Sequence, residues 1–300
     1  MDPRALTCLA VAAALAARLP AQTAPAVPKP ITAPLSLRLE KAPGNEQPAP
    51  VAGWSETRTR PRPLRIHFLR ADLRSPRIEP CVILGADPDG AGPAEATLTK
   101  PAALVRTEPR MLAAVNANAF AHLPGTSAAD RKRGWYPGKP VDIQGIAAAN
   151  GNVRSPHAGD RTDFWFDPDG KPHLGTAGDG PSIRHAVADW GDLLVRDGHT
   201  VAKPDTALHP RTLAGFDATS RWLWLVVVDG RNRGTSEGMT LTECAALMTA
   251  CGCANAINLD GGGSSILLQK DPAKPGLTTI NRPSDGTPRA IPVMLGVREK

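Results

Sequence analysis

The chain has 300 residues, of which 41% are hydrophobic and 21% charged, which is typical of a globular protein with one large or two small domains. Aromatic residues make up only 4%, whereas 28 Gly and 31 Pro indicate a turn-rich architecture and argue against a helical bundle. The formal charge of +6 favours anionic partners, but the basic residues gather only in two short segments, Arg58–Arg65 and Arg131–Arg133, without interleaved aromatic residues. This pattern argues against a nucleic-acid partner, and a solvated basic surface is the simpler interpretation.

The first 21 residues have the features of an export signal. Arg4 supplies a positive charge, Leu6–Ala17 is apolar and rich in Ala, and small residues around Ala21 suit a cleavage site. The apolar segment is too short for a stable membrane span. We therefore expect residues 1–21 to be a signal peptide and the mature protein to be exported to the periplasm or the extracellular space. An ordinary N-terminal helix is the alternative.

Nine Pro residues fall between residues 22 and 63, which is typical of a linker or an extended arm. Ordered structure is expected to begin at Leu64, where apolar residues alternate along a first strand, 64–73. The remainder, 64–300, contains no internal repeat and is predicted to be a single domain.

The following segments predict mostly strands. Apolar runs at 80–87 and 111–120 are strand candidates, and a polar, Gly- and Pro-rich loop at 122–140 is of the kind that often covers a site. The turn sequences Asn-Gly-Asn at 150–152 and Asp-Pro-Asp-Gly at 167–170 then predict hairpins.

One central strand and one helix are expected further on. Trp222–Val228 is continuously apolar, so this strand is predicted to be covered on both faces. Thr240 and Glu243 form a capping box for a helix that ends at Gly252, and the apolar segment 254–260 returns to strand. The whole pattern predicts an α+β fold, a single domain built on a mixed, strand-rich β-sheet with few helices.

Four cysteines remain once the signal peptide is removed: Cys81, Cys244, Cys251 and Cys253. In an oxidising compartment a disulfide involving Cys253 or Cys81 is possible, and four buried thiols are the alternative. Neither these cysteines nor the seven His have the spacing of a metal site, so no metal and no cofactor are predicted.

Two apolar strands end in the same dipeptide, Asp-Gly. The first delivers Asp229 and the second Asp260. If these strands are neighbours joined by the helix between them, both carboxylates emerge at one edge of the sheet, where α/β sheets tend to bind ligands. Two acids so placed can divide the work of catalysis between a protonated and an ionised group. The alternative is that each Asp only begins a turn with the Gly that follows it.

Three glycines and two serines follow the second acid. Glycines permit backbone conformations closed to other residues and let a ligand approach the main-chain N–H groups, while the serine hydroxyls add donors. The segment is neither a Walker loop nor a nucleophile elbow, since it lacks both Gly-Lys-Ser/Thr and Gly-x-Ser-x-Gly. A contact to a phosphate or to a sugar hydroxyl fits best.

Cationic and amide side chains flank these strands. Arg211 and Thr212 follow His209 just before a strand, and Arg231 directly follows the first Asp-Gly. Arg offers a planar fork of donors suited to phosphate oxygens, although a single Arg is more often part of a surface salt bridge. Asn116 and Asn118 at a strand end either cap a turn or bind a sugar.

Several of these segments together resemble the phosphodiester glycosidase family, the family of N-acetylglucosamine-1-phosphodiester α-N-acetylglucosaminidase. HPRTLAGFD, LWLVVVDGRNRGTSEGMTLTECAALM, AINLDGGGSSILL and NRPSDGTPR occur in the family's order and spacing, and MLAAVNANAF is similar to an earlier family segment. The resemblance spans about 64–298. It departs from the family at Ala117 and Asn118, where Gly-Gly is common, and at Pro288, where Glu usually precedes the late Arg.

The resemblance implies hydrolysis of the glycosidic C–O bond of a sugar 1-phosphodiester, with a phosphorylated sugar or glycan as substrate. One Asp would face the anomeric carbon and the other would orient water or a hydroxyl. A binding module that uses the same pocket without turnover, and a phosphodiesterase that breaks the P–O bond, are the competing interpretations. The implied catalytic residues are Asp229, Asp260 and Arg211, and the implied substrate-binding residues are Asn116, Thr212, Arg231, Gly261, Gly262, Gly263, Ser264 and Ser265.

Overall fold

The computed structural model describes residues 49–60, 62–179, 182–271, 273 and 275–300. The predicted signal peptide and most of the predicted arm lie outside this part of the chain. Strand β1 (Val51–Arg58) falls within the predicted arm, so strand structure begins before the expected start at Leu64. Its residues pair antiparallel with β2 (Leu64–Asp72) at the edge of the largest sheet, which turns part of the expected arm into an element of the fold.

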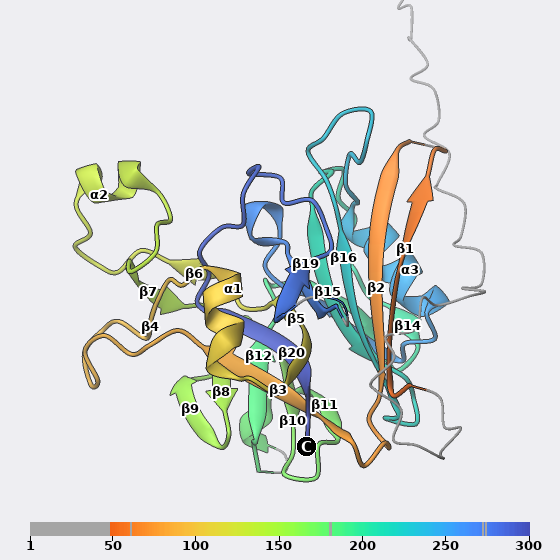
Figure 1. The fold of residues 1–300 in the computed structure, drawn as a ribbon, viewed down its shortest axis with the longest axis horizontal. Helices are drawn as coiled ribbons and strands as arrows, with labels where there is room; N and C mark the ends of the chain where they lie inside the picture. Colours follow the sequence, from red (N-terminus) through yellow and green to blue (C-terminus); the bar gives the residue numbers. More distant parts are fainter. Residues whose placement is uncertain (1–48, 61, 180–181, 272, 274) are drawn as a thin grey trace, which may run out of the picture.

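Four sheets and few helices make up the described residues, as the α+β prediction requires (Figure 1). The largest sheet has the order β1-β2-β16-β15-β17-β13-β14, with β16 (Trp222–Val228), β15 (Arg211–Phe216), β17 (Asn255–Asn258), β13 (Leu193–Arg196) and β14 (His199–Thr200). A second has the order β19-β18-β5-β20-β3, with β19 (Leu277–Thr279), β18 (Leu267–Lys270), β5 (Met111–Asn116), β20 (Val293–Glu299) and β3 (Ile78–Leu84).

The two remaining sheets are smaller. One has the order β11-β10-β12-β8-β9, with β11 (Pro172–Gly175), β10 (Asp163–Phe166), β12 (His185–Ala188), β8 (Ala147–Ala149) and β9 (Asn152–Ser155). The other has the order β4-β7-β6, with β4 (Ala96–Thr97), β7 (Pro140–Ile143) and β6 (Phe120–Ala121). The helices are α1 (Pro101–Leu104), α2 (Ala128–Arg133) and α3 (Leu241–Ala250), with single 3₁₀ turns η1 (Val105–Thr107), η2 (Ala177–Asp179) and η3 (Gly262–Ser264).

Strand β16 is buried on both faces, as its continuous apolar sequence predicts. Leu223, Leu225 and Val227 point into the core shared with the two five-stranded sheets, whereas Val226 and Val228 pack on the opposite face against α3. Thr240 accepts from the backbone N–H of Glu243, whose side chain accepts from the backbone N–H of Thr240, so the predicted capping box starts α3.

The strands that end in Asp229 and Asp260 are not neighbours. β15 lies between β16 and β17 and pairs antiparallel with both, so β16 and β17 run in the same direction. Both therefore end at the same edge of the sheet, although the two strands are one position further apart than we predict.

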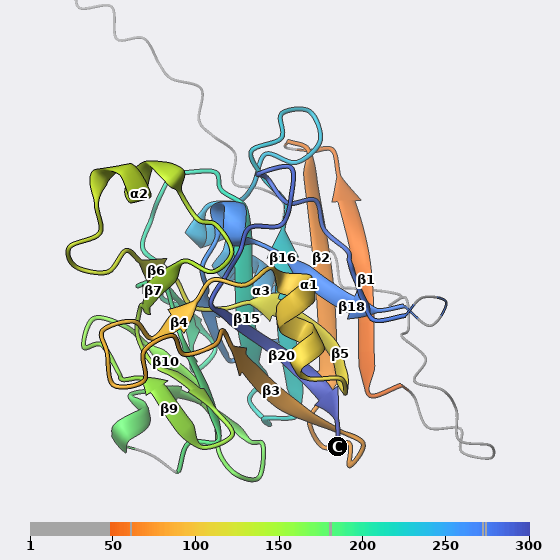
Figure 2. The same cartoon turned by 60° about the vertical axis from the view of Figure 1, so that its left-hand side comes forward.

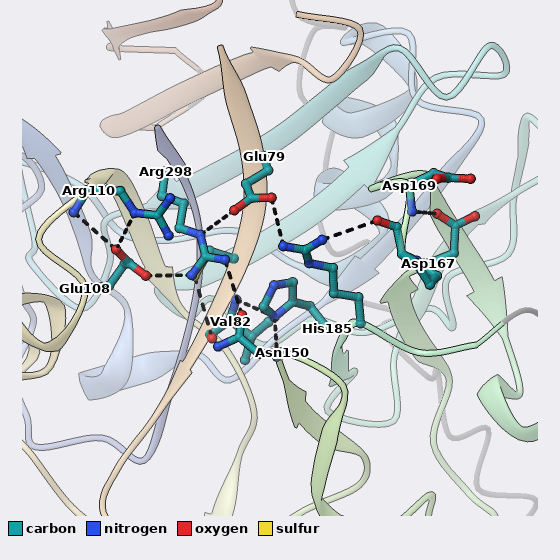
Figure 3. A network of polar contacts seen from close by, with 12 residues as sticks. Glu79, Val82, Glu108, Arg110, Asn150, Asp167, Asp169, His185 and Arg298 are labelled. Atoms are coloured by element: carbon teal, nitrogen blue, oxygen red, sulfur yellow. Dashed lines mark hydrogen bonds and ion pairs between the residues drawn. The ribbon is translucent and has the colours of Figure 1, made fainter. Parts of the chain in front are cut away.

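A buried ion-pair network links Arg298 of β20 to Glu79 of β3 and to Glu108 (Figure 3). The Arg298 guanidinium, only 5% exposed, donates to Glu79 at 2.8 Å, to Glu108 at 2.6 Å and to Asn150 at 3.2 Å. Close by, Nδ1 of His185 accepts from the backbone N–H groups of Val82 and Asn150. Burial, followed by the positive charge of Arg298, lowers the pKa of His185 to about 4. Removing one partner of such a network costs more than its net contribution to stability, because a buried charge is left unpaired.

Within the described residues, no helix is long and apolar enough to cross a membrane, and no three His, Cys, Asp or Glu side chains are grouped to hold a metal ion. Cys81, Cys244, Cys251 and Cys253 are all free thiols.

Candidate active site

Strands β16 and β17 end at the same edge of the sheet. The loops 230–238 and 281–290 lie at this end of the molecule (Figures 1 and 2). Val228 is opposite Arg211 on β15, and the N–H of Leu259 donates to the carbonyl of Thr212, so Asp229 and Asp260 follow at nearly the same height. With one strand between them, their main chains are roughly 10 Å apart. Asn281 links the two sides, since its amide donates to Oδ1 of Asp229 and to the carbonyl of Ser265.

Asp229 is buried and its carboxylate is surrounded by donors. The side chain of Asn281 donates to Oδ1 at 3.2 Å, and the backbone N–H of Arg282 lies 3.0 Å from Oδ1 and 3.2 Å from Oδ2. Nε2 of His67 is 3.1 Å from Oδ2, and Nδ1 of the same ring is 2.8 Å from the hydroxyl of Ser55. Only 4% of Asp229 is exposed, so these groups fix both the orientation and the surroundings of its carboxylate.

Two hydrogen bonds hold the main chain of Asp260, and the residue is half-buried. Its N–H donates to the carbonyl of Ala117, and its carbonyl accepts from the amide of Asn116 at 2.6 Å. Burial raises the pKa of Asp260 to about 6, against the opposing effects of the Ser264 hydroxyl, the guanidinium groups of Arg289 and Arg231 and the Gly261 N–H. A carboxyl group that titrates near neutral pH is suited to proton transfer.

Each of the three glycines after Asp260 allows a close approach that a side chain would block. A Cβ at Gly261 would lie 2.7 Å from the carbonyl oxygen of Pro210. Gly262 has a φ of +60°, and a Cβ there would lie 2.9 Å from Nη2 of Arg231. A Cβ at Gly263 would overlap the ion pair between Arg289 and Asp285. The glycines therefore admit two of the protein's own guanidinium groups to the turn beside Asp260.

Arg231, the arginine beside Gly262, has an unusual backbone conformation. Arg231 has a φ of +57°, a conformation that residues other than Gly rarely adopt, and its Nη2 lies 3.3 Å from Nδ1 of His209. Burial, followed by the charges of Arg211 and Arg231, lowers the pKa of His209, so its ring is neutral at neutral pH and accepts this bond. Strained backbone of this kind is concentrated at functional sites.

Three residues predicted for the site have their polar groups engaged within the protein. Arg211 donates from Nε to the carbonyl of Met239 and forms an ion pair with Asp205 at 3.1 Å, which directs its guanidinium toward the start of α3. The hydroxyl of Thr212 donates to Oδ1 of Asn116, which also accepts from the N–H of Ile266. Thr212 and Asn116 thus join β15, β5 and the end of β17 and position Asp260.

Several buried polar atoms near Asp260 have no hydrogen-bond partner. Among the described residues these include Oδ1 of Asn118, Oδ1 of Asn258 and the hydroxyl of Ser265. Buried polar groups are nearly always paired, so a cluster of unpaired ones beside a half-buried carboxyl indicates a place for a polar ligand or ordered water.

Our reading of the sequence missed His67, Asn281 and Asp285, and it noted Arg289 only for the residue before it. His67 and Asn281 lie far from Asp229 in the chain and carry no local signal, because strand pairing and a loop crossing bring them together. The segment NRPSDGTPR, Asn281–Arg289, contains both Asn281 and Asp285 as well as Arg289, and was the available signal.

A family model described as phosphodiester glycosidase matches residues 110–298, which is more than half of the chain. The chain belongs to the phosphodiester glycosidase family. The match includes all eleven residues predicted for the site, from Asn116 to Ser265.

Two solved structures that resemble this family member are distant from it in sequence. Its structure is similar to the catalytic domain of zebrafish N-acetylglucosamine-1-phosphodiester α-N-acetylglucosaminidase, auto-inhibited by its pro-peptide, with a TM-score of 0.60 and 20% identity over 83% of each chain. A hypothetical protein from Synechocystis gives a TM-score of 0.58 and 16% identity, over 83% of this chain and 62% of the other. These likenesses show the fold.

One curated relative, the SPbeta prophage-derived uncharacterized protein YomE of Bacillus subtilis (strain 168), is 30% identical over 128 residues. The aligned residues are 43% of this chain but only 15% of YomE, so the chain spans less than a fifth of this relative.

Proposed function

We propose that this protein is an exported glycosidase that hydrolyses the glycosidic C–O bond of a sugar 1-phosphodiester and releases the sugar and a phosphomonoester. One observation carries the proposal. The half-buried carboxyl group of Asp260 and the guanidinium groups of Arg231 and Arg289 lie together at the glycine turn. A phosphodiester of a sugar needs both kinds of group within reach of one another. Membership of the family supports the same chemistry.

In this proposal the two arginines bind the phosphate. Arg231 and Arg289 lie against Gly262 and Gly263, at the turn that follows Asp260. Arginine forks bind phosphate oxygens through paired, charge-assisted hydrogen bonds. Arg211 is assigned a positioning role instead of the predicted phosphate contact, because its guanidinium is buried, pairs with Asp205 and also donates to the carbonyls of Met239 and Ala207.

Asp260 acts on the sugar side. The bond from C1 to the phosphate oxygen breaks, and its electron pair stays on the phosphate. Ionised Asp260 stabilises the positive charge at C1, and it takes a proton from the water that forms the new C1–O bond. Asp229 has donors on both oxygens and acts as a positioning residue that fixes Asn281 and the 281–290 loop beside the turn.

The assay uses an N-acetylglucosamine 1-phosphodiester and compares the parent protein with Asp260→Asn. We expect kcat to fall about 10²–10⁴-fold, the usual contribution of a group that moves a proton in the transition state. Asp197→Asn is the matched control, because Asp197 is exposed in the β13–β14 turn and Asn suits its positive φ equally well. Full activity in Asp260→Asn would refute the assigned role.

Hydrolysis in ¹⁸O-labelled water identifies the bond that breaks. Label in the sugar product supports glycosidic cleavage, whereas label in the phosphate would mean P–O cleavage. Tight binding of the diester by the parent protein without any turnover would instead favour a carbohydrate-binding module.

We also propose that residues 1–21 direct export to the periplasm or beyond. N-terminal sequencing of the protein recovered from outside the cytoplasm tests this directly. An intact Met1 on the exported protein would contradict cleavage after Ala21.

A further inference from the structure

Trp190 lies beside the end of β17, the strand that leads into Asp260. Its backbone N–H donates to the carbonyl of Asn258 at 2.9 Å, and the N–H of Asn258 donates to the carbonyl of Asp192 at 3.0 Å. This exchange continues the antiparallel pairing of β13 with β17. Trp190 is thereby placed beside Asn258, two residues before the acid.

The indole of Trp190 is exposed at this edge of the sheet, and an arginine packs against one of its faces. The residue is 44% exposed and is one of three large hydrophobic residues exposed in the described part of the chain. The guanidinium of Arg161 lies 4.6 Å from the centre of its ring, and the Arg161 side chain is only 12% exposed. A cation stacked on one face of an indole fixes the ring and leaves the other face for a further partner.

Polar groups without partners lie on the neighbouring segments. The amide nitrogen of Asn118 donates to the carbonyls of Gln144 and Ile146, but its Oδ1 is buried without a partner. Asn118 follows Ala117, whose carbonyl accepts from the N–H of Asp260. A Cβ at Gly145, between those two carbonyls, would lie 3.2 Å from Cγ of Arg161. Asn118, Gly145 and Arg161 therefore connect the backbone of Asp260 to the indole of Trp190.

We propose that Trp190 is the platform on which the pyranose ring of the ligand lies at the Asp260 site, with Asn118 Oδ1 accepting from a sugar hydroxyl. One face of a pyranose carries mainly C–H groups and packs against an aromatic ring, while its hydroxyls need polar partners. A single exposed apolar residue is ordinary on a protein surface, so the position at the end of the strand that leads into Asp260, the stacked cation and the unpaired amide oxygen carry this assignment. It rests on the proposed function for the identity of the ligand.

The test follows the indole N–H signals of the six Trp by NMR, in the Asp260→Asn variant, during titration with N-acetyl-α-glucosamine 1-phosphate. The Trp190 signal is assigned by its loss in Trp190→Phe. We expect this signal to shift on titration, whereas glycerol 3-phosphate, which has the phosphate but no pyranose ring, leaves it in place. An unmoved Trp190 signal at saturating sugar phosphate would overturn the proposal.

Affinity and turnover give a second measurement. Trp190→Ala is expected to weaken binding of the sugar phosphate about tenfold or more, and Trp190→Phe to retain most of it, because burial of an aromatic face is lost only in the first. Trp222→Ala is the matched control. Trp222 is also stacked by arginines, Arg70 and Arg221, but it begins β16 at the opposite end from Asp229.

The two proposals fail in different ways. If the parent protein hydrolyses no phosphodiester but Trp190 still shifts with the sugar phosphate, the proposed activity is wrong and the platform stands. If hydrolysis occurs and Trp190→Ala keeps both the affinity and kcat/KM of the parent, the platform is wrong and the activity stands.

Discussion

Replacing Asp260 by Asn should stabilise the fold in a pH-dependent way. Burial raises the pKa of Asp260 from its ordinary value of 3.8 to about 6, which means that the folded protein holds the neutral carboxyl group more readily than the unfolded chain does. This difference corresponds to about 3 kcal/mol. The figure is an upper limit, because the side chain is only half-buried and water screens part of the penalty.

The sign follows from proton linkage. Below pH ~4 the carboxyl group is protonated in both states and imposes no penalty on folding. As the pH rises through about 6, the unfolded chain is already ionised while the folded protein must ionise a buried group, so the parent loses stability. Asn resembles the neutral acid and carries no such penalty. Asp260→Asn should therefore equal the parent near pH 4 and exceed it by up to about 3 kcal/mol at pH 8.

Urea unfolding followed by circular dichroism at pH 4, 6 and 8 measures this difference. Asp197→Asn, which changes an exposed carboxylate, should show no comparable dependence on pH. A gain that is the same at all three pH values, or a loss of stability at pH 8, would show that Asp260 is not held in its neutral form by burial.

Three further results are expected. kcat/KM for the phosphodiester should rise with pH through about 6 and then level off, because ionised Asp260 is the active form; activity that falls over this range would contradict its role as a base. Asp229→Asn should lose about 1–3 kcal/mol in urea unfolding, because an NH₂ group would then face the donors around the buried site, and an unchanged midpoint would argue against that network. Gly263→Ala should raise the KM for the phosphodiester by displacing Arg289, while Gly178→Ala, where the new Cβ would meet no atom within 4 Å, leaves KM unaltered; equal KM values in both variants would remove Arg289 from the phosphate site.

The local sequence was sufficient for those features whose physical cause is local. The capping box of α3 needs only Thr240 and Glu243, three residues apart, and the burial of β16 follows from seven consecutive apolar side chains. The position of Asp229 and Asp260 at one edge follows from two strands of the same direction with a helix between them. The family's order of motifs added the chemistry that these elements support.

Only the tertiary structure decided which groups meet. It inserted β15 between the two acid-bearing strands, turned Arg211 toward Asp205, and set Arg231 and Arg289 against the glycines. It also brought Trp190 beside Asn258 at the end of β17, and His67 beside Asp229. These contacts join residues far apart in the chain, and their geometry is set by strand register and by which small residues leave room for a large one. No periodicity or spacing within a single segment carries that information.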